Sequence, residues 1–417
     1  MNPRGLIVLT SFLCLAPWIF ADSPTAQPTE SGPVYHIYAG NTHSHTSFTW
    51  SHGEQWINPK PLPDGTKPKL LYVDPSGVQF PSKAMVLKQS WEKVQGPPSA
   101  HFALAKANGY DFYITSDHSQ EANLQPPSPD NTNWLATKRA AAEATDANFV
   151  AIAGYEHSEN NGPDGVGHLN VFNTDSYLNA MAPGIDLPYL YNWLKTAKPN
   201  GDGPVVASFN HPGPHQYNDW AYRDPQVTDI ITMLEVINSN DKIQYPAFIN
   251  ALDKGWKVSP VCGNDNHGLT GIKRHKSRTF VLATEKTKVA ILDAMKNRRT
   301  YAALDNNIQC RYSVNGSIMG STLNRPDDFS FDISISDPDV DNPKDAITKI
   351  DIVKDGGVVA QTYEVPTPSH QVSWKPTIHD STSKYFFVRV WDAGGGDAPK
   401  PKPNQPIAWL APVWTGR

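Results

Sequence analysis

The stretch PSAHFALAKANGYDFYITSDH, residues 98–118, contains the pattern from which the fold of this chain is predicted. Apolar residues at helical spacing predict a helix that runs through Ala107, with Ser99 as its capping residue. Gly109 suits the left-handed conformation in which many helices end. The apolar run at 110–115 then predicts a buried strand. The stretch therefore contains one helix and one strand, and polar residues follow the strand directly.

The same order recurs along the chain, with a strand ending each time in residues that can bind a metal. Strands are predicted at 34–40, at 110–115, at 149–153, within GPVVASFNHPG (203–213) and after Gly255. The polar residues that follow these five strands are His43, His45, Asp117, His118, Glu156, His157, His211, Asp265 and His267. Because chance would scatter such residues through helices and loops, their placement at strand ends indicates a functional site.

Apolar strands that alternate with helices are typical of a parallel sheet covered on both faces, which predicts an α/β protein. In a β/α barrel the functional groups gather at the carboxyl ends of the strands, as they do here. Beyond residue 304 the pattern changes to polar and apolar alternation between Gly, Asp and Pro turns, for example in DFSFDISISDP (328–338). That pattern predicts antiparallel strands in a small sandwich-like domain.

The N-terminal segment predicts export. Arg4 precedes an apolar run at 6–20, and Ala21 is a suitable residue for cleavage. The run is shorter than the roughly 18 residues of a membrane-spanning helix, and no second run of spanning length follows. We therefore expect a signal peptide at 1–21, a catalytic α/β domain at 34–304 and a β-rich domain at 305–417, in a soluble periplasmic or extracellular protein.

Composition narrows the choice of partners. The 417 residues are 39% hydrophobic and 18% charged, with a formal net charge of −5, so the chain offers no basic field for nucleic acid. A small phosphorylated substrate stays compatible with that charge. Of the three cysteines, Cys262 and Cys310 lie outside the signal segment, and we favour small buried thiols over a disulfide. The oligomeric state is not predicted.

Three histidines cluster in NTHSHTSFTWSHG, residues 41–53, at positions 43, 45 and 52. A His-x-His pair alone is weak evidence for a metal site. Here the pair follows a strand, and the other strand ends supply further histidines and carboxylates. The combination predicts a metal centre, because neutral imidazole and carboxylate both bind zinc, manganese or iron.

These motifs, taken in order, resemble those of the PHP superfamily, named for polymerase and histidinol phosphatase. The matching pieces are NTHSH, DFYITSDH, IAGYEHS, GHLNVFN, FNHPG, MLEVIN and GNDNH, and they cover roughly residues 34–304. The segment ALDNNIQCRYSVNG and the β-rich tail look like those of exported PHP proteins. The resemblance implies a distorted β/α barrel of PHP type with two or three divalent ions (Zn, Mn or Fe) at its mouth.

The resemblance also implies a role for each matching residue. His43, His45 and Asp265 would bind the first metal, and Glu156 would bridge the first two. The remaining ligands would be His118, His168, His211 and His267, with His52 the nearest candidate for the third member of the first motif. Glu156, Asp265 and His118 are the residues expected to act in catalysis, and Arg274 and Arg278 are candidates for holding a substrate phosphate.

Other polar residues near these motifs have several interpretations. Asp117 either caps a helix or orients His118, and Glu235 is a buried partner of the ligands or of a basic side chain. His157 and His215 are interpreted as structural.

The function implied is hydrolysis of phosphate esters by a metal-activated hydroxide at a di- or trinuclear centre. An amidohydrolase-like metallohydrolase is the nearest alternative, but that class typically bridges its metals with a carbamylated lysine, whereas the strand FVAIAGYEHS (149–158) offers Glu156. A non-catalytic, metal-stabilised binding protein is the other alternative. A nuclease is disfavoured by the acidic charge.

Overall fold

The computed structural model describes Met1 and residues 32–49, 56–57, 72–73, 79–80, 86–87, 92–159, 167–213, 215–397, 401–402 and 404–417. The chain divides into two compact units, Met1–Val34 and Tyr35–Arg417, and everything below concerns the second. His52 and nearly all of the predicted signal segment lie outside the described residues. Among the helices of the described part, none combines the length and apolar character needed to span a membrane.

The stretch at 98–118 forms the predicted helix and strand. Helix α2 (Pro98–Ala107) is followed by Gly109, whose φ is +77°, and then by β6 (Phe112–His118), which is buried throughout. The predicted cap was wrong: Pro97 is the residue before the helix, and no side chain caps it. Proline at the first helical position has no N–H to satisfy, which reduces the need for a capping side chain.

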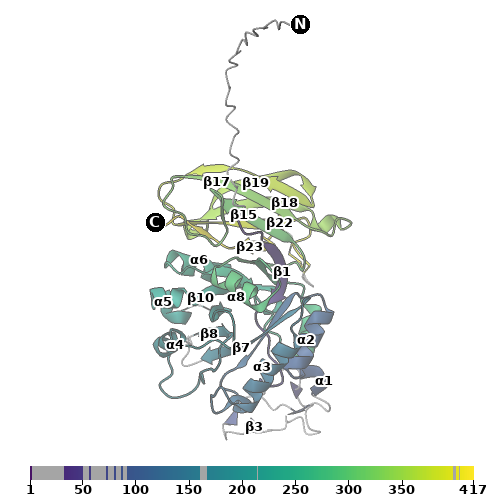
Figure 1. Cartoon of the computed structure of the whole chain (residues 1–417), viewed down its shortest axis with the longest axis vertical. Helices are drawn as coiled ribbons and strands as arrows, with labels where there is room; N and C mark the ends of the chain where they lie inside the picture. The colour runs from purple at the N-terminus through teal and green to yellow at the C-terminus, as the bar shows by residue number, and fades with distance from the viewer. Residues whose placement is uncertain are drawn as a thin grey trace, which may run out of the picture. The chain divides into compact units, whose positions relative to one another are not determined.

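Most strands belong to one large mixed sheet, visible through the centre of Figure 1. Its strands, in spatial order, are β11 (Lys242–Ile243), β10 (Ile231–Asn238), β9 (Val206–Asn210), β8 (Gly167–Phe172), β7 (Val150–Glu159), β6, β1 (His36–Asn41), β13 (Arg278–Ala283), β14 (Thr300–Ala303), β23 (Ala408–Leu410), β22 (Tyr385–Asp392), β18 (Ile347–Lys354) and β19 (Val358–Ser369). Two further strands pair off this path, β12 (Ser259–Cys262) with β10 and β24 (Val413–Trp414) with β22.

Helices flank the first part of this sheet (Figure 1). Besides α2 they are α1 (Glu92–Gln95), α3 (Thr132–Ala144), α4 (Leu187–Leu194), α5 (Pro225–Thr228), α6 (Tyr245–Asp253), α7 (Leu269–Arg274) and α8 (Lys288–Lys296). Two small two-stranded sheets pair β2 (Trp56–Ile57) with β5 (Val86–Leu87) and β3 (Tyr72–Val73) with β4 (Gln79–Phe80). The alternation of helices and strands predicted for this region is therefore present.

The sheet is mixed rather than parallel. Strands β1, β6 and β7 are parallel neighbours, as are β9, β10 and β12, but β8 is antiparallel to both β7 and β9, and β13 is antiparallel to β1. β7 ends at Glu159 and β8 begins at Gly167. That connection is too short for the crossover that parallel strands require, so the two strands form an antiparallel pair.

Two threonines attach β12 to β13 and β14, which lie far from β10 in the strand order. Thr279 of β13 donates its hydroxyl to the carbonyl of Cys262 and accepts the Cys262 backbone N–H, at 2.8 and 2.7 Å. Thr300 of β14 donates to the carbonyl of Pro260 at 2.9 Å. Side-chain hydrogen bonds thus connect β12, which pairs with β10, to β13 and β14.

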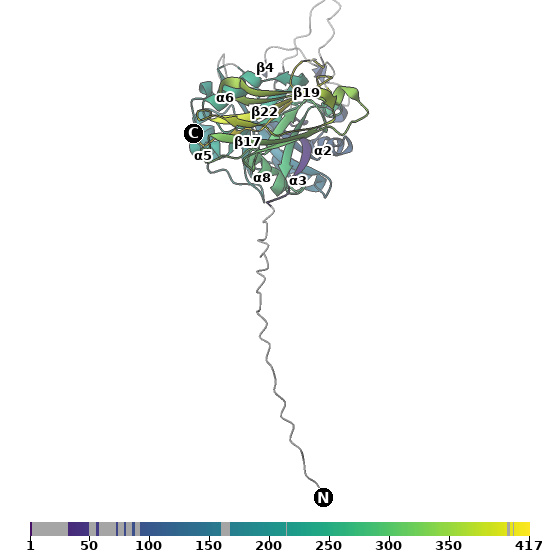
Figure 2. The same cartoon turned by 90° about the horizontal axis from the view of Figure 1, so that it is seen from above.

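The C-terminal region is antiparallel, as predicted. Strands β15 (Gln309–Val314), β16 (Ser317–Ile318), β17 (Asp328–Ser336), β20 (Gln371–Trp374) and β21 (Thr377–His379) form a second sheet. Antiparallel pairing of β14 with β23 joins the remaining C-terminal strands to the large sheet. Figure 2 looks onto this end of the unit, with β17, β19 and β22 toward the viewer.

Cys262 and Cys310 are both buried and free, in agreement with the interpretation favoured above.

Candidate metal centre

The histidines and carboxylates at the strand ends come together in the structure. His43 and His45 follow β1, His118 ends β6, Glu156 lies on β7, His168 on β8, His211 after β9, and Asp265 and His267 after β12. His45 and Asp265 are 220 residues apart in the chain, yet His45 Nε2 lies 3.1 Å from Asp265 Oδ1. The sheet therefore gathers residues from six strand ends at one site.

Glu156 lies at the middle of this cluster, with its side chain only 1% exposed. Its Oε1 is 3.3 Å from His43 Nε2, 3.2 Å from His168 Nδ1 and 3.3 Å from His211 Nε2. Its Oε2 is 3.1 Å from His118 Nε2 and 3.6 Å from His45 Nε2. The two oxygens thus face different sets of imidazoles, which is the arrangement a carboxylate needs in order to bridge two cations.

Asp265 completes the side of the cluster next to the first motif. Its Oδ1 is 3.5 Å from His43 Nε2 and 3.6 Å from His267 Nδ1. Its backbone φ is +46°, a left-handed conformation that costs free energy in a residue other than glycine. Such strained residues concentrate at functional sites, where the surrounding structure holds them in place.

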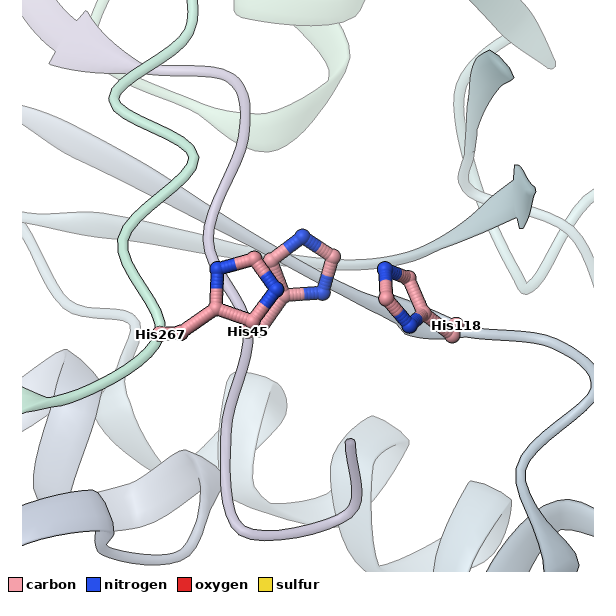
Figure 3. Close-up of side chains that lie close together, drawn as sticks. All are labelled: His45, His118 and His267. Carbon is pink, nitrogen blue, oxygen red and sulfur yellow. The ribbon is translucent and has the colours of Figure 1, made fainter. Parts of the chain in front are cut away.

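The rings of His45, His118 and His267 lie close together (Figure 3). The ring centroid of His45 is 4.0 Å from that of His267 and 4.5 Å from that of His118. One ligand atom from each of these three residues lies within 4.8 Å of the others. The same holds for three more groups, namely His43, His211 and Asp265; His43, His45 and Glu156; and Glu156, His168 and His211.

Glu235 on β10 orients two of the predicted ligands. Its Oε1 is 2.7 Å from His43 Nδ1, and its Oε2 accepts the backbone N–H of His211 at 2.8 Å. A hydrogen bond at Nδ1 leaves the lone pair of His43 Nε2 directed at the cluster. Gly263 makes room for this contact, since a Cβ there would lie 1.8 Å from Glu235 Oε1. Of the two roles considered for Glu235, the structure shows the buried partner of the ligands.

Asp117 holds the loop that carries His45. Its two oxygens accept the backbone N–H and the hydroxyl of both Thr46 and Thr49, at 2.7 to 2.9 Å. The Thr49 hydroxyl in turn lies 3.2 Å from His45 Nδ1. Asp117 therefore holds this loop through four hydrogen bonds rather than capping a helix. It positions the first motif from the neighbouring strand.

Several further groups around the centre were not anticipated from the sequence. Asn210 Nδ2 donates to Glu156 Oε1 at 2.9 Å, and the Ser158 hydroxyl donates to Oε2 at 2.9 Å. Glu121 Oε1 lies 3.5 Å from His118 Nδ1. Asn210 and Ser158 stand next to predicted site residues in the sequence, but nothing in the pattern distinguishes them from ordinary strand residues.

The charges in this cluster are strongly coupled. Burial works against ionisation of Glu156, yet the charges of His43 and His168 hold its pKa well below the ordinary value of 4.5. Burial also opposes protonation of His43, but Glu235 and Glu156 raise its pKa well above 6.5. Burial and repulsion from neighbouring imidazoles lower the pKa of His45 well below 6.5. Ionised carboxylates and neutral imidazoles such as His45 are the forms that bind metal ions.

The candidates for phosphate binding have other contacts. Arg274 is exposed, with Nη2 3.5 Å from Asn240 Oδ1. Arg278 is 5% exposed, donates to the carbonyls of His275 and Ser277, and lies 3.6 Å from the centre of the Tyr110 ring. These contacts show a structural use of Arg278, while a substrate role for either arginine stays a prediction.

Two histidines interpreted as structural differ in their surroundings. His157 is 1% exposed, and burial lowers its pKa to about 3. His215 is exposed, with Nδ1 3.3 Å from Asp219 Oδ1.

The donor set fits divalent transition metals. Imidazole nitrogens and carboxylate oxygens from eight residues converge, and both ligand types suit zinc, manganese and iron. Buried carboxylates and histidines at such short separations are costly unless paired or bound to a cation. The residues present can therefore hold divalent metal ions.

Comparisons with known proteins add one structural likeness. No family model and no curated protein matches the sequence. The structure is similar to that of a solved two-domain protein from Bacteroides vulgatus containing a predicted PHP-like metal-dependent phosphoesterase. The two chains are 16% identical, the match covers 91% of this chain and 95% of the other, and the TM-score is 0.43.

Proposed function

We propose that this protein is an exported metal-dependent phosphoesterase, with two or three divalent ions held at the centre built around Glu156. One observation carries the proposal: both oxygens of a buried carboxylate face imidazoles on different sides, at 3.1 to 3.6 Å. A mononuclear site would need only one such side. Zinc, manganese and iron all suit the donor set.

The proposed roles of the residues follow from their contacts. Glu156 would be the bridging ligand, and His43, His45 and Asp265 would hold one ion. His118, His168, His211 and His267 supply the other ligands. When bound, divalent ions of this kind lower the pKa of a coordinated water and neutralise charge on phosphoryl oxygens.

The chain itself supplies orientation and proton control. Glu235 fixes the tautomer of His43 through Nδ1. Burial raises the pKa of Asp265, but the neighbouring charges of His43 and His267 and the hydrogen bond from His45 lower it strongly, so its carboxylate is ionised near neutral pH and available as a ligand. Phosphoryl transfer requires mainly such positioning and charge stabilisation, which is why we favour a phosphate ester over a carbonyl substrate. A carboxylate stands at the bridging position, where the amidohydrolase alternative would require a modified lysine.

We also propose that strands β1, β6 to β10, β12 and β13 form a distorted barrel, with the side-chain bonds of Thr279 and Thr300 closing it at β12. The C-terminal strands would brace this barrel as a small sandwich.

The test is hydrolysis of an aryl phosphate by the purified chain, together with its metal content. We expect at least two bound ions and phosphate release that a chelator abolishes and added metal restores. His43→Ala and Glu156→Ala should each lower kcat/KM by at least about 100-fold. His379→Ala, which alters an exposed histidine paired with Asp328, is the matched control and should leave both quantities unchanged.

Other outcomes would separate the alternatives. Bound metal with hydrolysis of amides or carboxylic esters, but not of phosphates, would favour the amidohydrolase-like chemistry. Bound metal without turnover on any of these substrates would favour a metal-stabilised binding protein. A folded, remetallated chain that retains no metal would overturn the proposal.

A further inference from the structure

A second group of acidic side chains lies at strand ends in the C-terminal half and shares no residue with the histidine centre. Asp305 follows β14, Asp345 precedes β18 and Asp397 follows β22. One carboxylate oxygen from each lies within 4.8 Å of the others. Asp305 is 1% exposed and Asp345 is 4% exposed. Three carboxylates from distant parts of the chain are thus packed together, two of them buried and Asp397 half-buried.

A fourth carboxylate provides an independent indication of a missing ligand. Asp337, which follows β17, is 3% exposed. Its Oδ1 accepts the backbone N–H of Asp339 at 2.9 Å, but its buried Oδ2 has no hydrogen-bond partner among the described residues. Its charge acts on Asp305, and the charges of Asp345 and Asp397 act on it, so its carboxylate lies near the other three. An unpartnered buried carboxylate oxygen calls for a ligand.

The hydrogen bonds to the three grouped carboxylates all come from neutral donors. Asp305 Oδ1 accepts two backbone N–H groups at 2.7 and 2.6 Å. Asp345 Oδ2 accepts the side-chain amide of Asn342 at 2.7 Å, and Asp397 Oδ2 accepts that of Asn306 at 3.2 Å. Among the described residues, none of the four carboxylates is within 4.0 Å of a basic nitrogen. The negative charge is therefore not balanced by an ion pair.

The cations whose charges act on this group do not change this conclusion. His370 and Lys344 lower the pKa of Asp345, but burial and Asp339 outweigh them, so that its pKa is raised. Lys276 and Arg278 lower the pKa of Asp397, but burial and Asp345 outweigh them, so that its pKa is raised. The guanidinium of Arg278 is already bound to two carbonyls. Burial and neighbouring acids raise the pKa of Asp305 to about 7 and that of Asp337 to about 6. Four ionised carboxylates here would repel one another unless a cation joined them.

A nearby carboxylate shows the contrast. Asp392, at the end of β22, accepts backbone N–H groups from Gly394, Gly395 and Gly396 through Oδ1. The backbone therefore supplies the hydrogen bonds that this buried carboxylate requires. Oδ2 of Asp337 has no such donor, so its surroundings are those of a ligand rather than of a structural acceptor.

We propose that Asp305, Asp337, Asp345 and Asp397 form a binding site for one Ca²⁺ ion. Four carboxylates and no imidazole or thiolate make an all-oxygen donor set, which suits a hard cation with several oxygen ligands. The ligands come from β17 of the second sheet and from segments next to β14, β18 and β22 of the large sheet. Bound Ca²⁺ would therefore tie the two sheets together at this edge.

The test is a calcium titration of the complete chain after removal of metals with a chelator. Calorimetry should show one Ca²⁺ ion bound per chain, and Ca²⁺ should raise Tm. Asp345→Asn and Asp337→Asn should each weaken Ca²⁺ binding by about tenfold or more, because each removes a charged ligand. Without calcium, Asp345→Asn should melt no lower than the unchanged protein, since the substitution relieves repulsion among the carboxylates.

Two control variants make the result specific. Asp332→Asn removes one exposed charge from β17, the strand that directly precedes Asp337. This variant should leave calcium binding unchanged. His43→Ala alters the histidine centre and should also leave it unchanged, so failure of the proposed enzyme function would not affect this test. The proposal is overturned if the folded chain binds no Ca²⁺ at millimolar concentration. It is equally overturned if both aspartate variants bind Ca²⁺ as tightly as the unchanged protein.

Discussion

Glu156 and Glu235 show how two buried carboxylates divide the work at the histidine centre. Glu156 faces five imidazoles within 3.6 Å. Glu235 instead contacts His43 at Nδ1, the ring nitrogen that points away from Glu156, and accepts the backbone N–H of His211. The first is placed to bind cations directly and the second to hold a ligand in one tautomer. Removing either should weaken the centre, but for different reasons.

The Glu235→Gln variant tests the orienting role. Glutamine keeps an acceptor near His43 Nδ1 but loses the charge that favours a proton there, so we expect metal affinity to fall by about 10- to 100-fold. The measurement is metal competition with a chromophoric chelator, and the matched control is Glu364→Gln, an exposed position on β19. Because Glu235 raises the pKa of His43, the ring in the variant loses its competing proton at lower pH than in the unchanged protein, so the deficit should grow as pH rises, which a general loss of packing would not do. Unchanged metal affinity in Glu235→Gln would show that the charge of Glu235 does not contribute to metal binding.

His101 gives a prediction for stability against pH. Its ring is fully buried. Nε2 lies 2.6 Å from the backbone carbonyl of Gln95, and because a carbonyl can only accept, Nε2 carries the proton and donates it. Nδ1 accepts the hydroxyl of Ser44 at 3.2 Å. Burial lowers its pKa from 6.5 to about 4. Between about pH 6.5 and pH 4, this histidine is therefore protonated in the unfolded chain but neutral in the folded chain. The free energy of unfolding consequently falls as pH falls through this window. The loss reaches about 3 kcal/mol at most.

The measurement is urea unfolding at several pH values between 7.5 and 4.5, compared with His101→Gln. Glutamine does not titrate, so the variant should lose less stability than the unchanged protein as pH falls. A stability difference between the two proteins that stays constant across this range would contradict the assignment.

At the scale of single elements, the local pattern of the sequence predicted those that form within one stretch. α2, Gly109 and β6 follow from apolar spacing, a left-handed residue and an apolar run. The direction of β8 did not follow, because strand direction depends on the length of the connection and on neighbours elsewhere in the sheet. The attachment of β12 to β13 and β14 was also beyond prediction, since a threonine within a strand carries no sign of its partner.

That attachment can be measured through Thr279. Valine has nearly the same shape but no hydroxyl, so Thr279→Val should remove two buried hydrogen bonds to Cys262 and lower the free energy of unfolding by about 1–3 kcal/mol. Thr377→Val, on the exposed face of β21, is the matched control and should change stability by less than about 0.5 kcal/mol. Equal unfolding midpoints in urea for the two variants would show that the Thr279 bonds contribute nothing measurable to holding β12.

At the scale of the whole molecule, the histidine centre was predictable because strand ends collect at one edge of a sheet. His43, His45, His118, Glu156, His211, Asp265 and His267 each carry a visible signal, a metal-binding side chain after a predicted strand, whereas His168 was given only by the family resemblance. Asp117 carries the same signal but serves to orient the first motif. Asn210 and Ser158 carry no such signal, because they acquire their roles only from three-dimensional neighbours. The carboxylate group of the C-terminal half was missed for the same reason, since its members are spread from residue 305 to residue 397.

The central proposal is that the carboxylate of Glu156 bridges two divalent ions. Anomalous X-ray scattering from crystals of the metal-loaded protein tests this proposal most directly. Data collected on both sides of the absorption edge of the metal supplied should show at least two peaks beside the Glu156 carboxylate, one toward His43, His45 and Asp265 and one toward His168 and His211. Glu156→Gln crystals should lose at least one of them. A loaded crystal with no peak within coordinating distance of Glu156, or with a single peak unaffected by Glu156→Gln, would contradict the account.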